Sequence, residues 1–74
     1  MVQAMIKKEE LENLREKYPV GCTVELIKMD DVQAPPLHTK GVVRHIDDMG
    51  TIFVNWSTGS GLGVVYGEDY VKKI

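Results

Sequence analysis

The side chains that could act as nucleophiles or bases are few and scattered along the chain. His45 stands two residues before Asp47, Ser57 and Ser60 fall in a glycine-rich stretch, and Cys22 is the only cysteine. A catalytic nucleophile needs a base within hydrogen-bond reach, and nothing in this spacing would hold such a group together. We therefore expect no enzyme activity and assign no catalytic residues.

Metal and cofactor chemistry finds equally little support. A single cysteine cannot form an internal disulfide or a cysteine-rich zinc site. Three acidic pairs are present, Asp30-Asp31, Asp47-Asp48 and Glu68-Asp69, but their spacing matches no metal-binding loop such as the EF-hand. Aspartate favours turns because its carboxylate accepts hydrogen bonds from nearby backbone N–H groups. We expect no metal or cofactor, and interpret the pairs as turn residues or as an acidic rim that selects a basic peptide.

The only tryptophan, Trp56, allows two interpretations. Alternation along residues 51–56 places it on the same face as apolar neighbours, which favours a core position with the indole N–H at a wet edge. The alternative is an exposed platform that stacks on a proline, a base or a methylated lysine. Tyr66, Pro35 and Pro36 would then complete a groove beside it.

A second candidate surface is basic. The first two expected strands are flanked by Lys28, Lys40 and Arg44, which would contact phosphates if they lay on one outer face. Phe53 or Trp56 would then stack on bases. The net charge of the chain is −2 and no basic stripe is present, which argues against non-specific nucleic-acid binding. We therefore rank a nucleic-acid partner behind a protein or peptide partner.

The elements that must position these residues are a helix followed by short strands. Leu11, Leu14 and Tyr18 form one apolar stripe at helical spacing, so we expect a helix over residues 5–17 that ends before Pro19. Alternating apolar residues then predict five strands. Their expected ranges are 23–29, 42–47, 51–56, 62–65 and 70–74, with a long loop after the first strand and tight turns between the others.

Five short strands joined in this way predict a small barrel, because closure removes exposed sheet edges. Val43 and Ile46 are both core candidates but have opposite parity, so a β-bulge between them would let both face inward. The expected core consists of Val24, Leu26, Val43, Ile46, Ile52, Val54, Leu62 and Val64. A chain of 74 residues holds one domain, in which a helix over 1–18 packs on a barrel formed by 19–74.

The location of the protein is also constrained by composition. The longest apolar runs are only a few residues, which is too short for a membrane span. The opening MVQAMIKKEE has no apolar stretch of signal-peptide length. We expect a cytoplasmic protein with no membrane partner.

Several motifs resemble a known family of short bacterial and phage domains, domain of unknown function 4314. The likeness runs from about Leu14 to Ile74. Its most specific part is Met29-Asp30-Asp31, Ala34-Pro35-Pro36, Gly41, and Asp47-Asp48 leading to Gly50, Val54, Trp56 and Gly59. The resemblance implies a mainly β fold, an SH3-like five-stranded small barrel preceded by one N-terminal α-helix, and it implies no activity.

The chain departs from this family pattern at two positions. His38 stands where glycine is expected before the Thr-Lys-Gly turn, and Cys22 stands where a basic or polar residue is usual. More distantly, the G-x-V-x-x-I pattern at 41–46 is similar to KOW domains and other SH3-like modules.

Three functions follow as expectations. The leading one is a non-catalytic interaction module that binds a protein segment through the 30–40 loop and adjacent aromatic residues. The residues expected to carry it are Asp30, Asp31, Pro35, Pro36, Trp56 and Tyr66. The alternatives are a KOW-like nucleic-acid-binding module, which uses Lys28, Lys40, Arg44 and Phe53, and a structural or assembly accessory protein that pairs with itself or with a larger protein.

Overall fold

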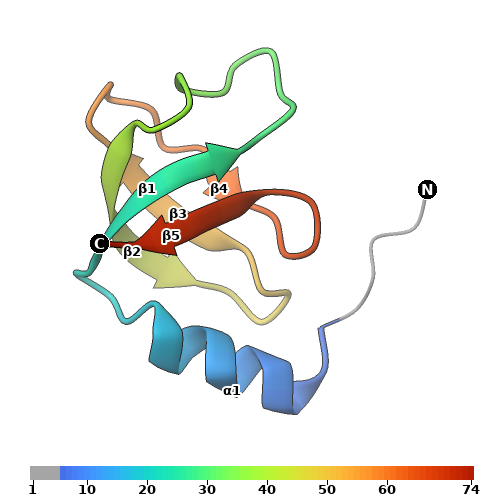
Figure 1. The fold of residues 1–74 in the computed structure, drawn as a ribbon. Helices are drawn as coiled ribbons and strands as arrows, with labels where there is room; N and C mark the ends of the chain where they lie inside the picture. Colours follow the sequence, from blue (N-terminus) through green and yellow to red (C-terminus); the bar gives the residue numbers. More distant parts are fainter. Residues whose placement is uncertain (1–5) are drawn as a thin grey trace.

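A computed structural model describes residues 6–74 of the chain. It is a mainly β protein with one helix and five strands (Figure 1). The elements are α1 (Lys8–Lys17), β1 (Thr23–Lys28), β2 (Lys40–Ile46), β3 (Ile52–Trp56), β4 (Gly63–Val64) and β5 (Tyr70–Lys73). The strands form one antiparallel sheet in the order β4-β3-β2-β1-β5.

The sheet is open, so the expected closure into a barrel is wrong. β4 and β5 are the two edges, and β4 contributes only Val64 and Gly63 to its ladder with β3. The chain turns away directly afterwards, because the N–H groups of Glu68 and Asp69 both donate to the carbonyl of Val65. A strand of two residues is too short to form a ladder on its other side as well.

Helix α1 covers the open end of the sheet in place of a closing strand (Figure 1). Leu11 and Leu14 pack against the buried core, and Tyr18 just beyond the helix is itself buried. The Tyr18 hydroxyl donates a hydrogen bond of 3.1 Å to the carbonyl of Val71 in β5. A helix of ten residues would not persist alone in water, so this packing stabilises it.

The helix begins later than the pattern predicted. The expected start at residue 5 lies outside the described residues, and α1 begins at Lys8. The Glu10 carboxylate accepts a hydrogen bond from the backbone N–H of Lys7, which satisfies one of the free donors at the helix start. Acidic residues occupy the first turn and basic residues the last, as the helix dipole favours.

The predicted β-bulge is confirmed. The β2–β3 register shifts between Val43 and His45, and both Val43 and Ile46 are buried. Arg44 and His45 both remain exposed because the extra residue lies on the solvent side of the strand.

The core matches the expected one closely. Every expected core residue is buried except Leu62, which is half-buried and packs against the others. Met29, Tyr18 and Trp56 complete it. The strand bounds differ by a few residues: β2 begins at Lys40 rather than at 42, and β4 covers Gly63–Val64 rather than 62–65. No helix within residues 6–74 is long and apolar enough to cross a membrane.

Candidate binding surfaces

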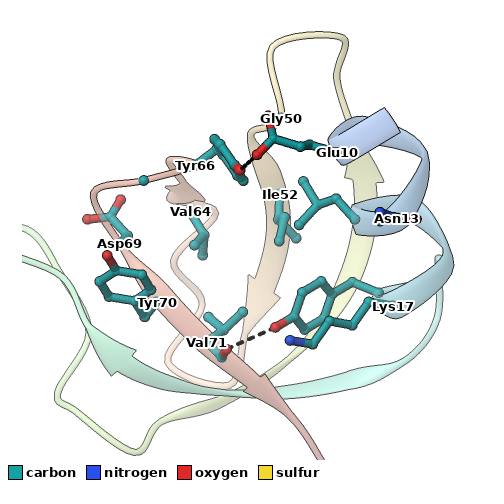
Figure 2. A pocket seen from close by; sticks show the side chains of 13 residues that line it. Glu10, Asn13, Lys17, Gly50, Ile52, Val64, Tyr66, Asp69, Tyr70 and Val71 are labelled. Carbon is teal, nitrogen blue, oxygen red and sulfur yellow. Dashed lines mark hydrogen bonds between the residues drawn. The ribbon is translucent and has the colours of Figure 1, made fainter. Parts of the chain in front are cut away.

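A groove of about 490 Å³ lies between α1 and the open end of the sheet, and we call it the α1–sheet groove (Figure 2). Its floor is apolar, because Leu14 of α1 faces Ile52, Val64 and Val71 from three different strands. Tyr18 closes one end of this floor. The groove lies where β4 and β5 do not meet. Ile52 and Val64 beneath it are buried, and Leu14 and Val71 are half-buried.

A hydrogen bond between Glu10 and Tyr66 forms one wall of the groove (Figure 2). The Tyr66 hydroxyl donates to the Glu10 carboxylate over 2.5 Å, and this bond lowers the pKa of Glu10, as does the bond from the Lys7 backbone. The same hydrogen bond raises the pKa of Tyr66, because ionisation would remove the donated proton, and burial and the charge of Glu10 raise it further. Glu10 is therefore a carboxylate at neutral pH, and this wall is negatively charged.

The other polar residues at the groove come from α1 and from the β4–β5 connection. Asn13 and Lys17 line it from the helix, and Asp69 lines it from the connection. The Asp69 carboxylate accepts a hydrogen bond of 2.9 Å from the N–H of Val65, which holds the turn in shape. The Lys17 ammonium lies 5.3 Å from the centre of the Tyr18 ring. The groove thus combines an apolar floor with two carboxylates and one ammonium group.

Trp56 belongs to the core, so an exposed platform at this position is ruled out. Its side chain is 3% exposed, and its indole N–H donates a hydrogen bond of 2.9 Å to the carbonyl of Leu62. Of the two interpretations of Trp56, the structure has the buried one, and no ring face is free for stacking.

The residues expected to form a groove around Trp56 do not come together. Pro35 is buried and Pro36 is exposed, in a loop at the opposite end of the sheet from α1 (Figure 1). Tyr66 lies instead at the α1–sheet groove, and no residue of the 30–40 loop lines that groove. The loop and Tyr66 are therefore separate surfaces.

One member of each acidic pair, Asp31, Asp47 or Asp69, bonds the backbone of its own turn, as one of the two interpretations had it. Asp31 accepts a hydrogen bond from the N–H of Gln33, and Asp47 accepts bonds from two backbone N–H groups of its own turn. Asp48 instead pairs with Arg15 of α1 at 3.0 Å, and Asp30 is exposed. Within residues 6–74, no group of three or more histidine, cysteine, aspartate or glutamate side chains comes together as a metal site.

Three basic residues of the strands, Lys40, Arg44 and Lys72, lie on what we call the outer sheet face. This face comprises Glu25, Lys40, Val42, Arg44, Phe53 and Lys72, with alternate residues of each strand pointing away from the core. Arg44 lies over the Phe53 ring, with 5.3 Å between the guanidinium carbon and the ring centre. Lys28 instead lies over the Tyr70 ring, beyond the irregularity in the β1–β5 ladder.

Charge is divided unevenly between the strands and the rest of the chain. The five strands carry five basic residues and one acidic residue, Glu25. The remaining segments carry ten acidic and four basic residues. The net charge of −2 is therefore the sum of a basic sheet, acidic turns and a helix that carries four acidic and three basic residues.

Sequence reasoning did not single out Glu10, Asn13 or Lys17. A signal was present, because Glu10, Asn13, Leu14 and Lys17 follow one another at helical spacing and so share one helix face. Which part of the sheet this face would meet depends on contacts that are distant in sequence.

A short helix that covers the open end of a five-stranded antiparallel sheet, with a groove between them, defines a small mainly β domain. The model of the family described as "Domain of unknown function (DUF4314)" matches residues 7–74, so the chain belongs to that family. The match begins closer to the N-terminus than Leu14, where the resemblance in the motifs begins. No curated protein and no solved structure matches the chain.

Proposed function

We propose that this protein is a non-catalytic interaction module that binds a protein segment in the α1–sheet groove. The observation that carries the proposal is the apolar floor formed by core side chains where β4 and β5 fail to meet. The volume of about 490 Å³ falls within the range of about 300–1,000 Å³ that is typical of ligand pockets. It is large enough to receive one or two apolar side chains of a partner.

The partner we propose carries an apolar anchor residue next to a basic residue. The anchor would bury against the half-buried Leu14 and Val71 and the exposed Tyr70 ring, and this burial would supply most of the affinity. Glu10 and Asp69 would attract the basic residue, since both lie at the groove. The acidic turns described above also favour a basic residue in the partner.

We also propose that the arrangement of strands is SH3-like. The order of the sheet supports this, because β1 to β4 follow one another as neighbours and β5 returns to pair with β1. The groove would then lie at the gap between the two edge strands, β4 and β5.

The experiment that tests the groove is selection of random peptides of about 12 residues displayed on phage, followed by binding of the enriched peptides to two variants. Asn13→Trp fills the groove from an exposed helix position, while Glu12→Trp adds the same ring at an exposed position that does not line it. We expect enriched peptides to share an apolar residue beside lysine or arginine. We expect Asn13→Trp to weaken them at least about tenfold, which corresponds to roughly 1.4 kcal/mol.

Three outcomes would contradict this function. The first is a selection that enriches no peptide, and the second is enriched peptides that bind Asn13→Trp as tightly as wild type. The third is a dimer in light scattering that Asn13→Trp converts to monomer, because the groove would then hold a second copy of the chain. That result would favour an assembly role.

A further inference from the structure

We propose that the outer sheet face binds a single-stranded nucleic acid through its phosphates. This surface is independent of the α1–sheet groove, since none of the residues that define it lines the groove. The face brings together cations, apolar side chains and one carboxylate, Glu25, whose charge is already paired within the protein.

Three charged residues form a row across the sheet. Glu25 of β1 pairs in register with Lys40 of β2 on one side and with Lys72 of β5 on the other. Side chains that are directly opposite in a ladder point to the same face, so the two ammonium groups flank one carboxylate. The row carries a net positive charge.

The carboxylate in this row is already satisfied. The Glu25 side chain is 17% exposed and accepts a hydrogen bond of 2.8 Å from the His38 ring. That bond, followed by the charges of Lys72, His38 and Lys40, lowers the pKa of Glu25. Because Glu25 is largely covered, a ligand approaching the face meets the lysine ammonium groups first.

A second line of residues on the same face runs along β2. Lys40, Val42 and Arg44 alternate onto the same face, so the two cations stand about 13 Å apart with an exposed valine between them. The bulge leaves Arg44 and His45 both beside Phe53, and the His45 and Phe53 rings stack with 5.9 Å between their centres. Along this face a valine stands between the two cations, and the stacked His45 and Phe53 rings lie beside Arg44, an arrangement that suits a strand whose phosphates and bases alternate.

The chemistry favours a nucleic acid over an acidic protein surface. Phosphates supply most of the non-specific affinity of such complexes, and the outer sheet face carries three cations, Lys40, Arg44 and Lys72, against one carboxylate. Phe53, His45 and Val42 offer contacts that unpaired bases can use and that carboxylate side chains cannot. A duplex keeps its bases stacked inside, so it would leave these contacts unused.

Fluorescence anisotropy with labelled oligo-dT and oligo-U of about 12 nucleotides tests the proposal across about 50–200 mM salt. Lys40, Arg44 and Lys72 would make three phosphate contacts, so the logarithm of the association constant K should fall with the logarithm of the salt concentration at a slope of about −2. The association constant should therefore decrease about 16-fold across this range of salt. The Lys40→Gln/Lys72→Gln variant should reduce the slope to about −0.7, since one contact remains. The control is Lys7→Gln/Lys8→Gln, which makes the same charge change at exposed positions at the helix start and should retain the wild-type slope.

Several results would overturn the assignment. One is the absence of any anisotropy change with either oligonucleotide at the lowest salt, provided that Trp56 emission reports a folded chain. If both double variants lost the same amount of affinity for the oligonucleotide, binding would depend on the net charge of the protein and not on this face. Tighter binding of a duplex of the same length would exclude the single strand, and equal displacement by poly-glutamate would indicate an acidic polypeptide ligand. None of these results depends on whether the groove binds a peptide.

Discussion

Gly41 of β2 lies directly opposite Trp56 of β3, and its missing side chain leaves the space that the indole fills. A Cβ atom placed on Gly41 would lie 2.9 Å from Cε3 of Trp56 and 2.5 Å from Cγ1 of Val54, both closer than such atoms pack. With this space free, the indole lies flat in the core and its N–H reaches the carbonyl of Leu62. The burial of Trp56 thus depends on a glycine on the neighbouring strand.

Gly41→Ala should destabilise the protein because the new methyl group overlaps Val54 and Trp56. Overpacking of this kind costs about 1–3 kcal/mol of unfolding free energy, which urea denaturation followed by Trp56 emission would measure. Gly61→Ala is the matched control, since a Cβ there meets nothing within 4 Å and the midpoint should barely move. Equal midpoints for the two variants would show that Gly41 is not needed for packing.

Trp56 should report a protected environment in the folded protein. As the only tryptophan, and one that is 3% exposed, it should emit at short wavelength and resist quenching by acrylamide. Unfolding in urea should shift the emission to the red and increase quenching several-fold. Red-shifted and easily quenched emission before unfolding would contradict the buried position.

His38 occupies a backbone conformation that favours glycine. Its φ is +72°, and its N–H donates a hydrogen bond of 2.7 Å to the carbonyl of Leu26, so the loop holds it in the left-handed region. This explains why the family pattern leads us to expect glycine at this position. In this left-handed conformation the His38 ring also forms its hydrogen bond with Glu25.

Two substitutions separate the backbone of His38 from its side chain. His38→Gly and His38→Ala both remove the contact with Glu25, but only glycine relieves the left-handed strain. We expect His38→Gly to exceed His38→Ala in unfolding free energy by about 1 kcal/mol, measured by urea denaturation at neutral pH. Equal stability of the two variants would be evidence against strain at this position.

The Glu10–Tyr66 hydrogen bond should make stability depend on pH in two directions. The pKa of Glu10 lies below its ordinary value of 4.5, so the stability it contributes is present above 4.5 and is lost as pH falls through the lowered value. The pKa of Tyr66 lies above its ordinary value of 10.0, so its contribution is present below 10.0 and is lost as pH rises through the raised value.

The variant that tests this dependence is Tyr66→Phe, compared with wild type by urea denaturation over a series of pH values. The difference in unfolding free energy should be largest between 4.5 and 10.0 and should shrink toward both extremes. Glu10→Gln keeps a neutral acceptor for the Tyr66 hydroxyl, so it should lose less than Tyr66→Phe at neutral pH, and its loss should also shrink in acid. A difference that stays constant from neutral pH to about pH 3 would contradict the bond.

The features that sequence reasoning anticipated depend on neighbours within a few residues. The spacing of Leu11, Leu14 and Tyr18 predicted the helix, and the opposite parity of Val43 and Ile46 predicted the bulge. Asp31 and Asp47 bond the N–H groups of their own turns. Side-chain period and local hydrogen bonds act along the chain, so they can be read from it directly.

The candidate surfaces could not be anticipated in the same way. Glu10 and Tyr66 are 56 residues apart, and only the position of α1 at the open end of the sheet brings them together. The expected barrel failed because β4 holds two residues, and the expected groove around Trp56 failed because Gly41 admits the indole to the core. Each outcome depends on packing between segments that no local pattern relates.

The class of elements, their order and most of the buried residues can be read along the chain, because hydrophobic periodicity and turn chemistry are local properties, and the motifs also indicate the family. That the sheet stays open, that a groove lies beneath α1, and that three cations share one sheet face all depend on contacts between distant segments. The reason is physical. Strand pairing places Lys72, Glu25 and Lys40 in one row, although they are far apart along the chain.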